Sequence, residues 1–328
     1  MIDLLDTSSG FDDDKLVDYK KHIVSHKDID KDLEDFLSGK APRGFKIGVP
    51  ALDDYFVLKK NAFYVLTGKK GQGKTTINQS IQVMFSIVNG LKWVVAFQEN
   101  DPMSMKMNYM SYLLGDFVKD VRKNDPLLYY KALKWVEDHF VFLKVRDVKT
   151  ATETTKYLID NGLDVHALLL DPINSFSSGW KSTGNNYTDS LLVADELLDF
   201  VKNTCSVHLS QHPIMSMQRQ SGAVSGADGE GGYYYNKASF TYSINKEKGS
   251  SQNEISVGNV RSKHTGGMET DPENPVIIHW SPIKIDIETK GMGNIQHDVI
   301  GRLRNFYDPL GIKNQKTPIP KGNIEDAF

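Results

Sequence analysis

The stretch GKKGQGKTT, residues 68–76, lies between the apolar run FYVL, residues 63–66, and a helix-like run that begins INQSIQVM. It matches the pattern G-x-x-x-x-G-K-[ST] in full. In such a turn the glycines let backbone N–H groups point inward around phosphate oxygens, and the helix that follows adds its N-terminal dipole. The sequence therefore predicts a nucleotide-binding loop between a strand and a helix.

Every residue of this loop is a predicted nucleotide contact: Gly68, Lys69, Lys70, Gly71, Gln72, Gly73, Lys74, Thr75 and Thr76. The Lys74 ammonium is expected to contact the β- and γ-phosphates, and the Thr75 hydroxyl is expected to bind Mg²⁺. A glycine-rich turn without a ligand is the alternative, which the position of the motif between strand and helix disfavours.

The pattern around the loop predicts an α/β fold. Strands are expected at 62–68, 92–99, 139–145, 166–173 and 205–214, and helices at 74–89, 126–139, 151–161 and 187–203. Nearly unbroken apolar strands that alternate with helices indicate a mostly parallel central sheet covered on both faces. Beyond residue 232, further runs at 238–247, 253–263, 274–280 and 283–289 predict antiparallel C-terminal strands that extend the same sheet.

Polar residues end three of the predicted strands. Asp171, in HALLLDPINS, is expected to join Thr75 as a Mg²⁺ ligand. Pro172 follows it, where many other ATPases have a glutamate that activates water, so Glu99 at the end of WVVAFQEN is the expected general base. Gln211, in VHLSQHP, is expected to sense the γ-phosphate. Taken singly, each is explained as well by a polar strand end, but the carboxyl ends of parallel strands meet at one edge of a sheet.

Three regions are expected along the chain. Residues 1–43 combine a disordered, acidic start with an amphipathic helical arm or linker, residues 44–290 form the nucleotide-binding domain, and residues 291–328 form a C-terminal extension with an acidic tail. Two polar segments, 174–186 and 215–232, interrupt the alternation of strands and helices. Loops of this length are usually functional or disordered.

Composition excludes several classes of protein. Cys205 is the one cysteine in 328 residues, which rules out a disulfide framework and a cysteine-based zinc site and predicts a reducing compartment. The formal net charge of −3 gives no global basic field. The N-terminus lacks the pattern of a secretion signal, and no apolar run approaches the ~20 residues that span a bilayer. A soluble, cytoplasmic protein without a membrane partner is expected.

The order of these motifs resembles the RecA-like ATPase core, and it is most similar to the DnaB-type replicative hexameric helicases. The approach GFKIGVPALDDYFVLKKNAFYVL, residues 44–66, resembles that family's entry into the P-loop strand. GNVRSKHTGG, residues 258–267, resembles the family's late strand, and this match makes Arg261 the arginine finger. The family's lysine two residues before the finger is replaced by Asn259, and Lys263 stands two residues after it.

This resemblance implies an ATP- and Mg²⁺-dependent helicase subunit that forms a homo-oligomeric ring, a hexamer, and translocates on single-stranded DNA by hydrolysis at subunit interfaces. The two long loops would line the channel, with Lys181, Arg219 and Lys237 as candidate DNA contacts and Trp180 as a stacking group. The acidic tail that ends in Phe328 resembles tails that dock on replication partners, so primase, polymerase and single-strand-binding protein are candidates. The compact build suggests a phage or plasmid protein in the host cytoplasm.

Other functions stay open on the sequence alone. A RecA-like recombinase or another filament-forming DNA-dependent ATPase would share the nucleotide chemistry, and a regulatory nucleotide-dependent scaffold would turn over slowly. The antiparallel strands and the VRSKHTGG segment favour the ring over the filament. Glu99, Asp171 and Arg261 argue against the scaffold. A solvated tail without a partner is the alternative for the last residues.

Overall fold

The computed structural model describes residues 26–38, 44–220, 222–229, 233–246, 252–258, 268–271, 275–289 and 295–312. The chain divides into two units, residues 1–43 and residues 44–328, which are described separately. In the first unit, helix α1 (His26–Leu37) exposes Ile29, Leu33 and Leu37. Because residues four apart share one side of a helix, the three side chains form an apolar stripe.

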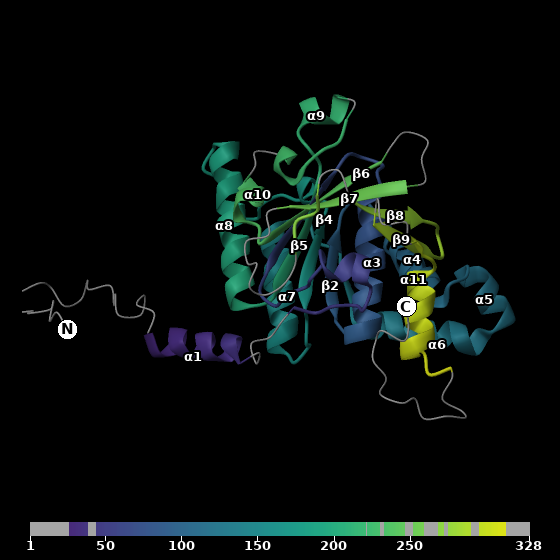
Figure 1. The fold of residues 1–328 in the computed structure, drawn as a ribbon. Coiled ribbons are helices and arrows are strands. Elements are labelled where there is room, and N and C mark those ends of the chain that lie inside the picture. The colour runs from purple at the N-terminus through teal and green to yellow at the C-terminus, as the bar shows by residue number, and fades with distance from the viewer. Residues whose placement is uncertain are drawn as a thin grey trace, which may run out of the picture. The chain divides into compact units, whose positions relative to one another are not determined.

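The second unit is built on a mixed sheet with the strand order β10-β9-β8-β7-β6-β1-β5-β4-β2-β3 (Figure 1). Strands β6, β1, β5, β4, β2 and β3 run parallel, and β7 to β10 continue antiparallel beyond β6. The predicted α/β class with antiparallel C-terminal strands is confirmed. The strands are β1 (Phe63–Gly68), β2 (Trp93–Phe97), β3 (Phe140–Leu143), β4 (Ala167–Asp171), β5 (Ser206–Gln211), β6 (Phe240–Asn245), β7 (Gln252–Gly258), β8 (Val276–Trp280), β9 (Ile285–Thr289) and β10 (Ile295–Gln296).

Strand β6 differs from the prediction, which placed it in the antiparallel extension. It pairs with β1 in parallel, with Tyr64 opposite Phe240 and Leu66 opposite Tyr242. A parallel neighbour requires the chain to cross from one end of the sheet to the other, and the long connection after β5 provides that crossing. The antiparallel extension therefore begins at β7.

Helices cover both faces of this sheet. Those of the described second unit are α2 (Pro50–Asp53), α3 (Lys74–Asn89), α4 (Pro102–Leu114), α5 (Val118–Asn124), α6 (Pro126–His139), α7 (Val148–Asp160), α8 (Asn186–Asn203), α9 (Met215–Arg219), α10 (Tyr233–Lys237) and α11 (Val299–Tyr307), with 3₁₀ turns η3 (Ile173–Ser175) and η4 (Gly226–Asp228). None of the helices in the described residues is long and apolar enough to cross a membrane.

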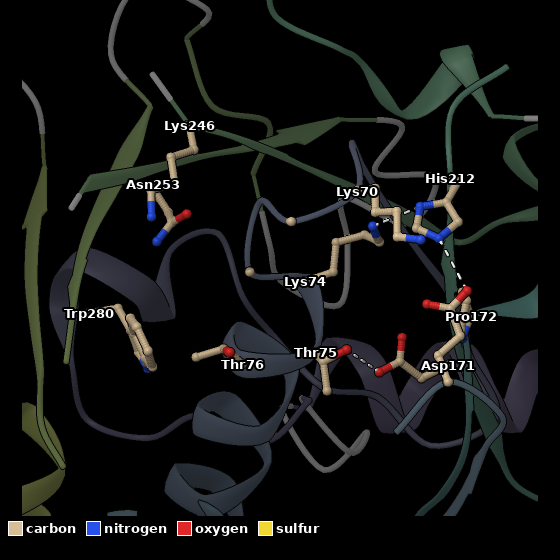
Figure 2. Close-up of a pocket in the computed structure, with 13 residues that line it drawn as sticks. Lys70, Lys74, Thr75, Thr76, Asp171, Pro172, His212, Lys246, Asn253 and Trp280 are labelled. Carbon is tan, nitrogen blue, oxygen red and sulfur yellow. Dashed lines mark hydrogen bonds and ion pairs between the residues drawn. The ribbon is translucent and has the colours of Figure 1, made fainter. Parts of the chain in front are cut away.

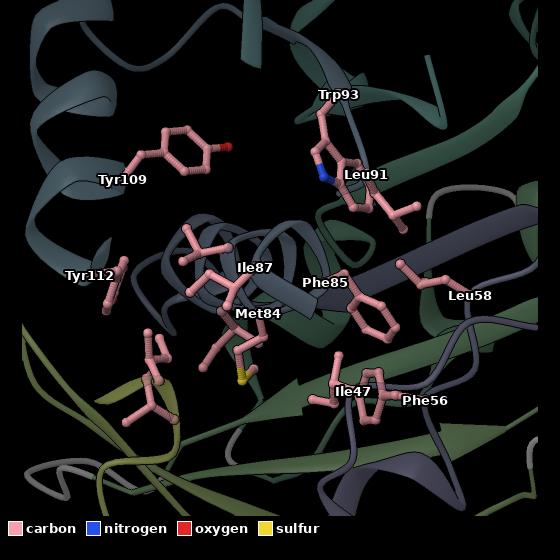
Figure 3. Packing of buried hydrophobic residues seen from close by; sticks show 14 of the residues in the cluster. Ile47, Phe56, Leu58, Met84, Phe85, Ile87, Leu91, Trp93, Tyr109 and Tyr112 are labelled. Atoms are coloured by element: carbon pink, nitrogen blue, oxygen red, sulfur yellow. The ribbon is translucent and has the colours of Figure 1, made fainter. Parts of the chain in front are cut away.

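Two core clusters lie on opposite faces of the sheet. One joins α3, α4, α6 and α11 to the strands, and Figure 3 shows Met84, Phe85 and Ile87 of α3 packed in it. The other joins α7 and α8 to the opposite face. Successive residues of β1 alternate between them, since Tyr64 belongs to the first cluster and Phe63 to the second. Burial on both faces explains the nearly continuous apolar strands of the sequence.

Local signals fix several helix ends. Aspartate side chains accept hydrogen bonds from backbone N–H groups in the first turns of α4, α6 and α7, through the pairs Asp101–Ser104, Asp125–Leu128 and Asp147–Thr150. Such N-caps satisfy donors that the helix itself leaves unpaired. The predicted helices at 74–89 and 126–139 match α3 and α6 to the residue.

Helix α11 was not predicted from the sequence. It buries Val299, Ile300 and Leu303 in the cluster that contains α3. The Arg304 guanidinium donates hydrogen bonds to the carbonyl oxygens of Tyr112 and Leu113, at 3.2 and 3.3 Å, and so binds the last turn of α4. This part of the C-terminal extension packs on the nucleotide-binding domain, and the predicted boundary at residue 290 stays a prediction.

Candidate nucleotide-binding site

The loop between β1 and α3 has the backbone that a phosphate cradle requires. Gly71 and Gly73 have positive φ angles of 78° and 88°, a region that glycine reaches without steric cost. Gly73 is also the N-cap of α3, so the N–H groups of the first helical turn open toward the loop. The predicted strand–loop–helix context of the motif is thus present.

A cavity of about 360 Å³ opens at this loop (Figure 2). The predicted residues that line it are Lys70, Gly71, Gly73, Lys74, Thr75, Thr76, Glu99 and Asp171. Four further lining residues were not singled out by the sequence analysis: His212, Lys246, Asn253 and Trp280. The cavity therefore brings together three segments that are far apart in the chain, and the residues that were expected to bind phosphate, Mg²⁺ and the attacking water share it.

Lys74 is buried at the base of the cavity. Its Nζ donates hydrogen bonds to the carbonyl oxygens of Gly68 and Lys69, at 2.8 and 3.2 Å, and lies 3.0 Å from Nδ1 of His212. Burial lowers the pKa of Lys74 to about 8, while the charges of Asp171 and Glu99 oppose that change. The ammonium is thus held over the loop in a position from which it can pair with phosphate oxygens.

Thr75 and Asp171 face each other across the loop. The Thr75 hydroxyl donates to Oδ2 of Asp171 at 2.7 Å, and the Ser210 hydroxyl donates to Oδ1. Asp171 is 1% exposed, and this burial raises the pKa of its carboxyl group, whereas the two hydroxyl donors lower it. A carboxylate beside a hydroxyl offers the hard oxygen ligands that Mg²⁺ prefers. The pair fits the predicted role in binding Mg²⁺.

Glu99 lies just beyond the end of β2, and its side chain is 43% exposed. Its Oε1 accepts a hydrogen bond from the Ser175 hydroxyl at 3.0 Å and lies 3.7 Å from Nε2 of His212. The carboxylate is therefore oriented from two sides while it still faces solvent. A carboxylate with access to water, at the edge of a phosphate-binding cavity, has the placement of a general base.

His212 connects the two halves of the site. One ring nitrogen faces Lys74 and the other faces Glu99, and its backbone N–H donates to Oδ1 of Asn174 at 2.7 Å. Burial and the charge of Lys74 lower the pKa of His212, so its ring is neutral at pH 7. The only sequence signal for this residue was its place directly after the strand end LSQ.

Gln211 does not reach the cavity, so the expected contact with the γ-phosphate is not seen. Its side chain is buried and its Nε2 donates to Oγ1 of Thr67 on β1, at 2.9 Å. A Cβ on Gly229 would overlap that same amide nitrogen, so the segment after η4 packs directly on Gln211. Because strand residues alternate in direction, the residue that follows Gln211 enters the cavity in its place.

Lys69 and Gln72 shape the loop from outside the cavity. The Lys69 Nζ donates to the carbonyl oxygens of Gln220 and Gly222, at 2.6 and 2.8 Å. Oε1 of Gln72 accepts from the backbone N–H of Lys69 at 2.8 Å. Lys69 was predicted to contact the nucleotide, but in this structure it ties the phosphate loop to the second long polar segment.

The three candidate DNA contacts have different surroundings. Lys181 and Arg219 are exposed, and Arg219 ends α9, which projects from one end of the molecule (Figure 1). Lys237 instead forms an ion pair with Asp195 on α8, at 2.5 Å, and is only about one third exposed. Trp180 packs against the core cluster of α7 and α8. Arg261, Asn259, Lys263 and the acidic tail lie outside the described residues.

Solved structures with the same architecture complete this description. No family model matches the chain, and no curated protein matches its sequence. The solved ATPase domain of a DnaB-like helicase superposes with a TM-score of 0.64 at 13% sequence identity, over 80% of this chain and 97% of that domain. A longer DnaB-like replicative helicase superposes with a TM-score of 0.60 at 11% identity, over 79% of this chain. The fold is that of DnaB-like helicase ATPase domains.

This RecA-like P-loop NTPase fold is the one that the order of motifs predicted. The chain covers 65% of the length of the DnaB-like replicative helicase and nearly all of the solved ATPase domain. At such identities the likeness concerns the fold, and the chemistry has to be argued from the site itself.

Proposed function

We propose that this protein is a Mg²⁺-dependent ATPase that acts as a ring-forming helicase subunit on single-stranded DNA. The observation that carries the ATPase is the shared cavity of Lys74, the Thr75–Asp171 pair and Glu99. Phosphate binding, metal binding and water activation need these three kinds of group at one site. The helicase part rests on the fold shared with DnaB-like ATPase domains.

The arrangement supports in-line hydrolysis. The glycine loop and Lys74 would bind the triphosphate, and Mg²⁺ held by Thr75 and Asp171 would neutralise charge on its oxygens. Glu99 accepts a proton from water, whose oxygen bonds to the γ-phosphorus while the bond to the β–γ bridging oxygen breaks and ADP leaves with the electron pair. Ser175 and His212 orient the Glu99 carboxylate during proton transfer.

Two contacts offer a route from the nucleotide to the DNA. Lys69 joins the phosphate loop to the residues that follow Arg219, and Gln211 joins β1 to the segment after η4. A change in the loop on hydrolysis would therefore reach the segment that carries Arg219. We propose that Arg219 and Lys181 contact DNA phosphates, and that Lys237 contributes less because Asp195 pairs with it.

Assembly supplies the remaining parts of the proposal. Arg261 would act as an arginine finger on the nucleotide of the next subunit, and the apolar stripe of α1 would dock on a neighbouring protomer. A hexameric ring places several weakly basic loops around one channel. The acidic tail would bind a primase, polymerase or single-strand-binding protein.

The test combines turnover with particle shape. ATP hydrolysis is measured with and without single-stranded DNA, and particles are imaged with a non-hydrolysable ATP analogue. Stimulated turnover and closed rings are expected, and Glu99→Gln should bind ATP without hydrolysing it. Helical filaments would replace the helicase by a recombinase-like function, and slow turnover that DNA does not stimulate would indicate a scaffold.

Arg261 has its own test. Mixing Arg261→Ala with Lys74→Ala protein should restore part of the activity that each variant lacks, because a mixed interface can combine one intact loop with one intact finger. Absence of rescue in rings shown to co-assemble would contradict a finger that acts between subunits.

A further inference from the structure

The cavity has a second wall, formed by Asn253 of β7 and Trp280 of β8. In Figure 2 these side chains lie on the other side of the phosphate loop from Asp171 and His212. Asn253 pairs with Ile278 across the two antiparallel strands, so Trp280, two residues further on, lies on the same face of the sheet. Neither residue has a role in phosphate binding, metal binding or water activation.

Asn253 breaks an apolar row. The residues that follow it on the same face of β7, Ile255 and Val257, are buried in the core cluster. Asn253 is itself 3% exposed, and its Oδ1 is buried without a hydrogen-bond partner among the described residues. A buried carbonyl oxygen without a donor costs free energy, so an amide at the end of an apolar row indicates that a ligand supplies the donor.

The position of Asn253 identifies which part of a nucleotide can reach it. A Cβ on Gly73 would lie 3.6 Å from Oδ1 of Asn253, so the amide stands beside the phosphate loop at van der Waals distance. Phosphate oxygens only accept hydrogen bonds and cannot satisfy a carbonyl oxygen. The donors available on a nucleotide are the ribose hydroxyls and the exocyclic amino group of the base.

Trp280 presents a flat apolar surface next to this acceptor. Its indole N–H donates to the hydroxyl of Tyr112 on α4, which fixes the ring orientation from behind. An oriented indole at the mouth of a nucleotide cavity is a stacking platform for a base. Thr76, the last residue of the phosphate loop, lines the cavity beside this ring in Figure 2.

We infer that the Asn253–Trp280 wall binds the nucleoside part of the nucleotide: Trp280 stacks on the base, and Asn253 Oδ1 accepts a hydrogen bond from the ribose or the base amino group. This inference rests on the proposed nucleotide site. It divides the cavity into a phosphate wall from the parallel strands and a nucleoside wall from the antiparallel extension.

The experiment compares ATP with inorganic tripolyphosphate, which has no nucleoside. Equilibrium binding with Mg²⁺ is measured for the parent, Trp280→Leu, Trp280→Phe, Asn253→Ala and the control Ser256→Ala, whose side chain points to the opposite face of β7. Trp280→Leu should weaken ATP binding by about tenfold or more, as base stacking on aromatic rings implies. Trp280→Phe should restore most of it. Tripolyphosphate binding should change in neither variant.

Asn253→Ala resolves the identity of the donor. If the donor is the ribose 2′-hydroxyl, this variant erases the difference between ATP and dATP, and if it is the base amino group, it erases the difference between ATP and ITP. Either loss supports the inference. ATP binding that is unchanged in both Asn253→Ala and Trp280→Leu overturns it, as does an equal loss of tripolyphosphate. A parent protein that binds neither ligand would instead overturn the proposed function.

Discussion

Buried polar groups occur in two regions of the parallel sheet, and their surroundings are opposite. At the carboxyl edge, Lys74 and Asp171 are buried with at least two polar partners each. Away from that edge, His166, just before β4, and His208, within β5, are also buried. Among the described residues, neither nitrogen of His166 nor Nε2 of His208 has a hydrogen-bond partner. The first region is arranged for a reaction, and the second is packing.

The histidines contact aromatic rings instead of polar groups. His208 stacks on Tyr64 at a centroid distance of 4.3 Å and meets Trp93 edge-on at 5.2 Å. His166 meets Trp93 and Phe45 edge-on, at 5.5 and 5.3 Å. Burial lowers the pKa of His166 to about 4, and Lys60 adds to the shift. The comparison teaches that a buried polar group indicates chemistry only when its neighbours can use its charge or hydrogen bonds.

The largest effect expected from this comparison concerns Lys74. Lys74→Ala removes the cation that faces the phosphates and should lower ATP hydrolysis by about 10²–10³-fold or more. His166→Phe, at a residue of equal burial, should leave ATP hydrolysis unchanged, because it alters only packing. Steady-state turnover of both variants with and without DNA is the measurement. A loss of turnover in His166→Phe with an intact fold would show that the second region takes part in the reaction.

A smaller effect is expected at Gln211, which is buried and partnered but lies outside the cavity. Gln211→Met keeps the length of the side chain and removes the hydrogen bond to Thr67. We expect basal hydrolysis to remain and the stimulation by DNA to fall by about 5- to 100-fold, the range of typical coupling free energies. The measurement is the ratio of turnover with DNA to turnover without it. A preserved ratio would exclude Gln211 from coupling.

The sequence predicted most of the fold because the decisive signals are local. Glycines at positive φ, aspartate N-caps and doubly buried strands each leave a mark within a few residues. The site was predicted in part for the same reason, since the loop, Glu99 and Asp171 stand at strand ends. His212, Asn253 and Trp280 escaped prediction because their directions depend on strand register and on pairing between distant segments. The misplaced β6 has the same cause.

Asp171 tests whether the reaction site costs stability. Asp171→Asn removes a buried charge and keeps groups that can bond to the Thr75 and Ser210 hydroxyls. In the absence of Mg²⁺ and nucleotide, we expect the variant to be more stable by about 1 kcal/mol, or ~2–4 °C in Tm, while hydrolysis is lost. Thermal unfolding in EDTA measures this. A lower Tm would mean that the carboxylate stabilises the fold even without its metal.

The smallest effect, and the one that isolates the packing region, is a dependence of stability on pH. Burial also lowers the pKa of His208 well below its usual value, and His166 adds to this shift. The folded-state pKa values are thus depressed relative to about 6.5 in the unfolded chain. Above pH 6.5 both states are neutral at these histidines and they contribute no slope. Below it the unfolded state binds protons that the folded state refuses, so the free energy of unfolding falls as the pH falls.

For each histidine the slope approaches about 1.4 kcal/mol per pH unit, and for His166 it continues down to pH about 4, where the folded state accepts the proton as well. Carboxylates titrate in the same range, so the parent protein alone does not reveal the contribution of the histidines. His166→Phe removes one of them, and the cavity that borders this residue leaves room for the larger ring. Denaturant unfolding at pH 7 and pH 5 should therefore show a difference in stability between the two pH values that is smaller by about 1–2 kcal/mol in His166→Phe than in the parent. Equal differences in the two proteins would mean that His166 is protonated in the folded state at pH 5, and that the second region is as polar as the first.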